Sequence, residues 1–255
     1  MIKTPTNKNT GTLIVIMGVL VLLGIGTASV YYKRQNENVD PRIKAARTLY
    51  EKYNIYAQDN NFDSVFYLMD TIESIYNQHE HYRNSFEKGV LYNNRAAALL
   101  TKVVILDSAN ASFKDSILEV AEKNINTSIH IYQQWNSRFN SVNNKSISEI
   151  IHEEFLHDLE CHDEKLKQRI ISNRINEIKT ALGETDRRLS VCYTNLGIIY
   201  RHKGQYEAAA ASYKKAITLW DKNLTAENNL NKLLNRPLKK INIIQKLFPP
   251  DRKGD

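Results

Sequence analysis

Residues 190–223 decide the fold of this chain, and they read SVCYTNLGIIYRHKGQYEAAAASYKKAITLWDKN. Apolar, aromatic and small side chains recur at three- and four-residue steps on both sides of Lys203 and Gly204. Such steps place side chains on one face of a helix. Gly204 can adopt the positive φ that ends a helix. The stretch therefore predicts two antiparallel helices joined by a tight turn.

Two positions of this hairpin are small, Gly197 and Ala209, where the two helices have to approach closely. The rings of Tyr200 and Tyr213 are expected to fill the gaps beside them, and Tyr206 to pack at the start of the second helix and set the hairpin angle. The positions that carry the pattern are Tyr193, Leu196, Gly197, Tyr200, Gly204, Tyr206, Ala209, Tyr213 and Ala216.

These residues resemble the tetratricopeptide repeat, a helix–turn–helix unit of 34 residues. Only the late proline of the family is missing, and Asp221 stands in its place. The resemblance implies an α-solenoid of stacked hairpins, in which the first helix of each hairpin lines a concave surface for a peptide or a partner helix.

Two further hairpins are expected upstream, because repeats occur in arrays. One candidate covers residues 46–79, with its turn at 59–61, and the other covers residues 89–135. In the second, extra residues near 107–115 lengthen either the first helix or the loop. Lys52 in the first candidate stands at a position that is normally apolar.

Residues 136–185 fit no 34-residue frame, yet their apolar residues keep helical spacing. They are predicted to form an insertion of one or two long helices, the last ending at Gly183. A capping helix at residues 224–235 would close the array. The sequence thus predicts an all-α domain over residues 42–235.

The N-terminal region contains a candidate membrane anchor. Residues 13–32 read LIVIMGVLVLLGIGTASVYY and carry no charge. Twenty helical residues span about 30 Å, the thickness of a hydrocarbon core. Residues 1–12 would form a short tail, and residues 33–41 a tether that ends at the helix cap Asp40 and Pro41. The alternative is a signal peptide, residues 1–28, that is cleaved after Ala28.

The charge pattern suggests where the domain lies. The chain carries a net charge of +7, and more Lys and Arg follow the predicted anchor than precede it. This excess favours a cytoplasmic domain in a single-pass membrane protein. Residues 236–255 form a basic amphipathic tail, expected to dock on the last repeat or alternatively to contact anionic lipid.

The sequence contains no motif that would indicate several common classes of function. No signature of a nucleic-acid-binding module, no phosphate-binding loop and no nucleophile motif is present, so neither nucleic acid nor a cofactor is expected and the chain is predicted not to be an enzyme. Cys161 and Cys192 have no paired spacing and are expected to be free thiols.

The segment from His152 to Asp163 is rich in possible metal ligands. His152 and His157 are five residues apart, whereas the zinc motif on a helix needs four. Glu153, His157 and Cys161 would share one helical face, but three ligands on one straight helix rarely converge on an ion. No metal site is predicted, and a metal-dependent enzyme remains the least favoured alternative.

The favoured hypothesis is a non-catalytic, membrane-anchored scaffold or adaptor that binds a protein or peptide. The exposed side of residues 190–202 would present Asn195, Ile199 and His202, and Arg188 would meet acidic groups. By the resemblance, Asn195 is the type of residue that holds the backbone of a bound peptide. The alternative is a regulatory or assembly subunit of a membrane complex that contacts it through the inserted helices.

Overall fold

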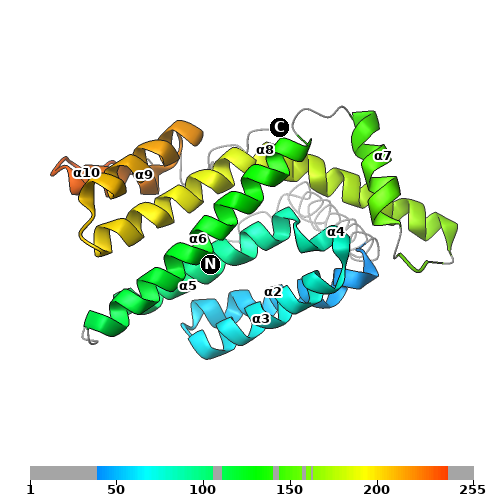
Figure 1. Ribbon diagram of the computed structural model, residues 1–255, viewed down its shortest axis with the longest axis horizontal. Helices are drawn as coiled ribbons and strands as arrows, with labels where there is room; N and C mark the ends of the chain where they lie inside the picture. Colours follow the sequence, from blue (N-terminus) through cyan, green and yellow to red (C-terminus); the bar gives the residue numbers. More distant parts are fainter. Residues whose placement is uncertain (1–38, 106–110, 140–143, 157–158, 162, 241–255) are drawn as a thin grey trace, which may run out of the picture.

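The computed structural model describes residues 39–105, 111–139, 144–156, 159–161 and 163–240. Within these ranges the chain forms helices and turns but no strand, so the prediction of an all-α fold is confirmed. Figure 1 shows the arrangement. The elements in chain order are η1 (Pro41–Ile43), α2 (Lys44–Gln58), α3 (Phe62–Gln78), α4 (Glu80–Arg83), α5 (Phe86–Ile105), α6 (Ala111–Phe139), α7 (Asn144–Phe155), α8 (Glu164–His202), α9 (Tyr206–Leu219) and α10 (Leu224–Leu233).

The predicted anchor, residues 13–32, lies outside the described residues, as do the tail before it, the first part of the tether and residues 241–255. Among the helices that are described, none combines the length and the apolar character needed to cross a bilayer.

The first helical turn that the structure describes begins at a buried capping residue, Asp40. Asp40 Oδ1 accepts a hydrogen bond from the backbone N–H of Arg42 at 2.9 Å, as expected for a residue that caps a first turn containing Pro41. The other carboxylate oxygen accepts from the hydroxyl of Tyr82 at 2.8 Å. Since Tyr82 belongs to α4, this contact joins the start of the domain to the connection between α3 and α5.

The first hairpin consists of α2 and α3. Its turn contains Asn60 with a φ of 54°, a left-handed conformation that asparagine tolerates better than most residues. Asn61 then caps α3 by accepting from the backbone N–H of Ser64 at 3.2 Å. Lys52, which stands at the normally apolar position, is exposed.

In both the second and the third hairpin, a glycine of the first helix lies against a tyrosine ring of the second helix. In α8, a Cβ on Gly197 would lie 2.4 Å from the ring of Tyr213 in α9, and in α5 a Cβ on Gly89 would lie 2.7 Å from the ring of Tyr132 in α6. Each glycine therefore lets a buried tyrosine of the second helix lie directly on the backbone of the first. The turn of the third hairpin is made by Gly204, whose φ is 75°.

Helix α8 is longer than the sequence suggested. It runs without a break for 39 residues through Gly183, so the prediction that an inserted helix ends there is wrong. A glycine inside a helix costs about 1 kcal/mol relative to alanine. Here Ala181, Glu184 and Thr185 are buried on both sides of it, and their packing keeps the backbone helical.

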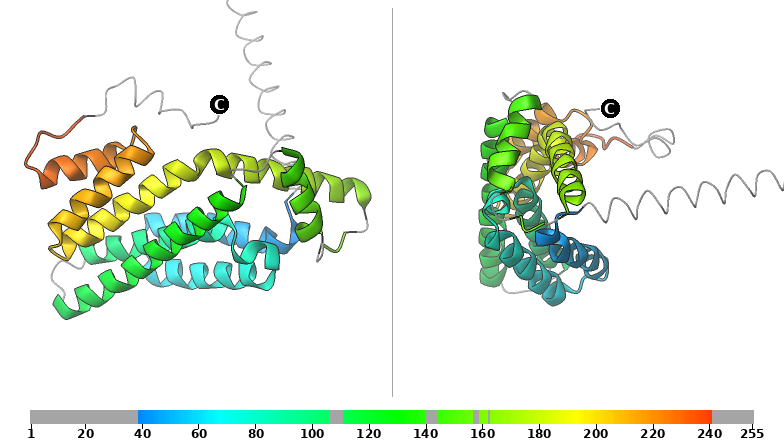
Figure 2. Two further views of the ribbon diagram at one scale, coloured as in Figure 1. Left: turned by 45° about the horizontal axis from the view of Figure 1, so that its top comes forward. Right: turned by 90° about the vertical axis from the view of Figure 1, so that its right-hand side faces the viewer.

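The hairpins stack in sequence. Helix α3 packs on α5 and α6 on α8, so the second helix of each of the first two hairpins contacts the first helix of the next, and α9 packs on the single helix α10. The pairs α2–α3, α5–α6 and α8–α9 lie in successive positions in Figure 1. The long α8 extends beyond its own hairpin toward α7 (Figure 2), and this first half belongs to the predicted insertion.

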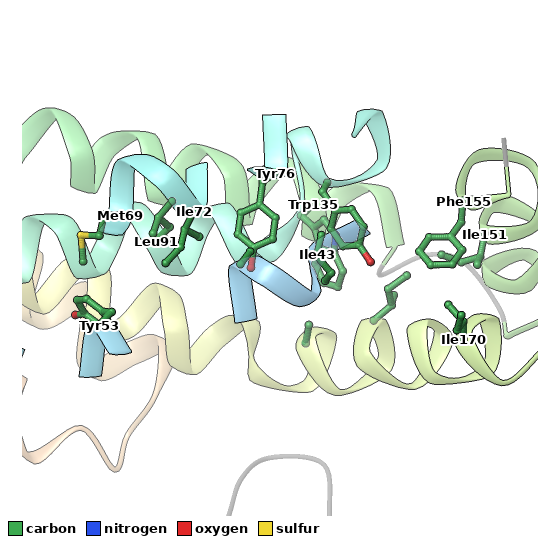
Figure 3. Packing of buried hydrophobic residues seen from close by; sticks show 14 of the residues in the cluster. Ile43, Tyr53, Met69, Ile72, Tyr76, Leu91, Trp135, Ile151, Phe155 and Ile170 are labelled. Atoms are coloured by element: carbon green, nitrogen blue, oxygen red, sulfur yellow. The ribbon is translucent and has the colours of Figure 1, made fainter. Parts of the chain in front are cut away.

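The first half of α8 and α7 are part of the core. Ile170 and Ile178 of α8 are buried in the same apolar cluster as Ile72 of the first hairpin, Trp135 of the second and Phe155 of α7. Figure 3 shows this cluster along α8. The insertion therefore shares its core with the first two hairpins, while a second cluster joins α5, α6 and the last part of α8.

Candidate protein-binding site

A line of polar side chains connects the first helices of the three hairpins. Asn195 of α8 donates through Nδ2 to Oδ1 of Asn93 in α5 at 3.0 Å. The neighbouring Asn94 donates to the hydroxyl of Tyr50 in α2 at 2.6 Å. The first helices therefore face one another through amide and hydroxyl groups, which can bind a peptide backbone or hold the array together.

Beside this line lies a pocket of about 300 Å³ between α5, α6 and α8. Its lining combines apolar, amide and charged groups from all three helices. The lining residues are Val90, Asn93, Tyr132, Thr180, Glu184, Arg187, Arg188 and Val191.

Arg188 has an unusual position in this pocket. Its guanidinium carbon lies 5.2 Å from the centre of the Phe86 ring, a cation–π geometry, and Tyr132 lines the same pocket. Its Nη1 is buried and has no hydrogen-bond partner within the described residues. A buried guanidinium nitrogen without an acceptor is costly, so the site favours a ligand that supplies one.

The other charges in the pocket are already paired. Arg187 Nη1 donates to Glu184 Oε2 at 2.6 Å, and its guanidinium carbon lies 5.3 Å from the centre of the Trp220 ring. Glu184 is buried, and its carboxylate forms an ion pair with Arg187 in the lining of this pocket. Burial raises the pKa of the Tyr132 hydroxyl, which therefore stays protonated and can donate a hydrogen bond.

The four residues that the sequence suggested for partner binding lie in different environments in the structure. Arg188 lines the pocket, and Asn195 lies at its edge through the contact with Asn93. Ile199 is completely buried in the second cluster, so the prediction that it is exposed is wrong. Helix α6 packs against α8 and covers that side. His202, in the last turn of α8, is only partly exposed.

Most of the repeat-motif positions have the expected environment. Leu196, Ala209, Tyr213 and Ala216 are buried, and Tyr193 and Tyr200 are half-buried. Tyr206 differs, because 56% of it is exposed. Its ring is therefore not buried between the helices, whereas the ring of Tyr213 lies against Gly197 in the interior of the hairpin.

Sequence reasoning missed the pocket residues outside the third hairpin. Asn93 and Asn94 follow one another in the middle of α5, and this pair of amides was a usable signal for a functional or network position. Thr180 and Glu184 gave no signal, because they belong to the insertion, which matches no repeat frame.

The segment rich in histidine does not form the helical face that was considered. Helix α7 ends at Phe155, and Cys161 follows in an irregular segment, so Glu153 and Cys161 do not share a helix. His152 and Glu153 are exposed on α7. In the ranges that the structure describes, no group of three or more His, Cys, Asp or Glu could hold a metal ion. His157, Asp158 and His162 lie outside those ranges.

Comparison with known families matches residues 190–223 to the tetratricopeptide repeat. This is the third hairpin, and the match covers that one unit. Tetratricopeptide repeats suggest a helical domain that binds proteins, and such domains are typically non-catalytic. No curated protein and no solved structure matches the chain.

Proposed function

We propose that this protein is a non-catalytic scaffold or adaptor, held at a membrane by residues 13–32, which binds an acidic segment of a protein partner at the pocket around Arg188. The observation that supports this is the guanidinium nitrogen of Arg188, which is buried beside the pocket between α5, α6 and α8 and has no acceptor among the described residues. An Asp or Glu side chain of the partner would complete its hydrogen bonds.

The position of the pocket fits a peptide rather than a small metabolite. Asn93 and Asn195 lie beside it, and side-chain amides both donate to and accept from a peptide backbone. A hydrogen-bonded anchor residue with neighbouring amide contacts is a frequent way of holding an extended segment.

The first half of α8 restricts where a partner can lie. Its Glu177 pairs with Arg47 of α2, and its Arg174 pairs with Glu87 of α5. These contacts occupy part of the surface that the first helices of hairpins one and two present. The proposed site is therefore confined to the region where α5, α6 and the middle of α8 meet.

Binding is tested with the full chain in mild detergent and an array of immobilised peptides that pairs each acidic sequence with its Asn or Gln counterpart. We expect preferential retention of acidic sequences. Arg188→Met keeps the apolar stem over Phe86 but removes the guanidinium, and it should weaken retention roughly tenfold. Arg169→Met, at an exposed position of the same helix, is the matched control. Equal retention by both variants would refute the site.

Membrane attachment is a separate part of the proposal. The uncharged run at residues 13–32 supports it, as does the basic flank that follows. Full-length chain should stay in the membrane pellet after alkaline carbonate washing, and deletion of residues 13–32 should release it. A reporter fused after Asp255 would report the side of the domain, which we propose to be cytoplasmic. Full release of the intact chain by carbonate would exclude the anchor.

The alternative, contact of a membrane complex through the inserted helices, requires another kind of test than deletion. Ile170, Ile171 and Ile178 of the insertion are buried in the main cluster. Removing residues 136–185 would therefore expose the core of the first two hairpins. Charge reversals at exposed positions in the first half of α8, Lys165→Glu and Lys179→Glu, distinguish a contact through the insertion from one at Arg188.

A further inference from the structure

A second cavity, of about 380 Å³, lies between α4, the end of α6, α7 and α8. Glu80 and His81 contribute from α4, Arg138 from α6, Glu153 from α7 and Arg174 from α8. None of its lining residues belongs to the pocket around Arg188. The two sites therefore have separate linings, although Arg174 and Arg188 both lie over the ring of Phe86.

The cations of this cavity are already neutralised. Arg138 forms an ion pair with Glu154. Arg174 pairs with Glu87 at 2.5 Å and with Glu177 at 3.1 Å. Neither guanidinium is left to attract an anion.

Two carboxylates of the lining have no such partner. Glu80 and Glu153 are exposed, and within the described residues neither side chain takes part in a hydrogen bond or an ion pair. Since the basic groups are paired, these two carboxylates determine the residual charge of the cavity, which is negative. The cavity consequently attracts a cation and repels an anion.

The wall of the cavity includes two aromatic rings. Trp135 and Phe139 have their ring centres 5.0 Å apart, and both are buried in the main cluster shown in part in Figure 3. The guanidinium carbon of Arg138 lies 5.2 Å from the centre of the Phe139 ring. The cavity thus already holds one guanidinium against an aromatic ring, the same environment that favours a cation from outside.

His81 adds a requirement of a different kind. Its Nε2 accepts a hydrogen bond from Arg174 Nε at 3.0 Å. Burial and the charge of Arg174 lower the pKa of His81 to about 2, so the ring is neutral and its proton is on Nδ1. Nδ1 is buried and has no partner among the described residues. This N–H lacks an acceptor, such as a carbonyl oxygen.

We propose that this cavity binds an Arg or Lys residue of a partner protein, with the cationic group between Glu80 and Glu153 and a carbonyl oxygen of the same segment accepting from His81. A basic residue in a peptide offers both groups, whereas a simple amine offers only the charge. The site goes beyond the proposed function, because it recognises the opposite charge at another place on the fold.

The test uses calorimetric titration of the full chain in mild detergent with the acetylated and amidated tripeptide Gly-Arg-Gly. The same peptide with citrulline in place of arginine keeps the shape but has no charge. We expect the citrulline peptide to bind roughly tenfold more weakly or not at all. Ethylguanidinium, which has the cation but no carbonyl group, should also bind more weakly than the arginine peptide.

The double substitution Glu80→Gln with Glu153→Gln should weaken binding of the arginine peptide roughly tenfold. Both positions are exposed, so the fold should remain intact. The matched control exchanges the exposed Glu51 and Glu207 for Gln, away from the cavity, and should leave binding unchanged.

Equal binding of the arginine and citrulline peptides, or of the wild-type chain and the Glu80/Glu153 variant, would overturn the proposal. Ethylguanidinium binding as tightly as the tripeptide would overturn the part assigned to His81. Arg188→Met should not change any of these titrations, so failure here is distinguishable from failure of the acidic-peptide site.

Discussion

Replacing Gly197 by alanine tests the contact that holds the third hairpin together. The new Cβ would lie 2.4 Å from Cε1 and 2.6 Å from Cδ1 of the Tyr213 ring. Unbonded carbon atoms prefer a separation of about 3.5–4.0 Å. Tyr213 is completely buried, so its ring has no solvent to move into, and α9 has to shift by about 1 Å to accept the methyl group.

The expected magnitude combines two opposing effects. Overpacking of a well-packed core costs about 1–3 kcal/mol. Alanine is favoured over glycine inside a helix by about 0.8–1 kcal/mol. The net result for Gly197→Ala is a loss of up to about 2 kcal/mol. Gly183→Ala, at an exposed position of the same helix, has only the favourable effect and should gain up to about 1 kcal/mol.

Urea unfolding of the full chain, followed by circular dichroism in one detergent, measures both variants. Adding Tyr213→Leu to Gly197→Ala should relieve the overlap, so a double-mutant cycle should show favourable coupling of about 1 kcal/mol. If Gly197→Ala were as stabilising as Gly183→Ala, the close approach of α8 and α9 would be wrong, and with it the packing assigned to the hairpin.

Three further predictions concern buried groups. Arg174→Met should lower the free energy of urea unfolding by about 3–5 kcal/mol, because Glu87 would lose its cation in the interior. Adding Glu87→Leu should restore most of this stability. If it restores none, the ion pair of Arg174 with Glu87 is not supported. Because the pKa of His81 is lowered to about 2, only the unfolded chain takes up this proton as the pH falls below about 6.5. Stability should then fall by up to about 1.4 kcal/mol per pH unit, and His81→Asn should reduce that slope between about pH 6.5 and 5. An unchanged slope in the His81→Asn variant would contradict the lowered pKa of His81. A polar thiol reagent should modify the half-buried Cys161 in the native chain and Cys192 only after unfolding, since burial raises the pKa of Cys192 to about 12. Mass spectrometry of the digested chain measures the modification of each cysteine. Modification of Cys192 in the native chain would refute the prediction.

Local patterns in the sequence were sufficient for the helical class and for the hairpins. The nine motif positions of residues 190–223 define a helix, a turn and a second helix because each depends on side chains within one 34-residue unit. The cap at Asp40 and the turn at Asn60 were also readable, since helix ends and left-handed turns have local chemistry.

Burial of individual side chains was less predictable than helix positions. Ile199 is an example, because its exposure depends on how α6 lies against α8 and not on α8 itself. The pocket was also beyond local patterns. Arg188 was named from the sequence, but Asn93, Thr180 and Glu184 join it only through the contact of helices that are far apart in the chain.

The amino-acid sequence alone determined that residues 190–223 form a helical hairpin, because the spacing of its small and aromatic residues encodes close packing between neighbours in the chain. Only the tertiary structure decided that α8 continues through Gly183 and that its first half lies in the core of the first two hairpins. The physical reason is that burial of Ile170 and Ile178 against distant helices outweighs the local preference of a glycine to end the helix.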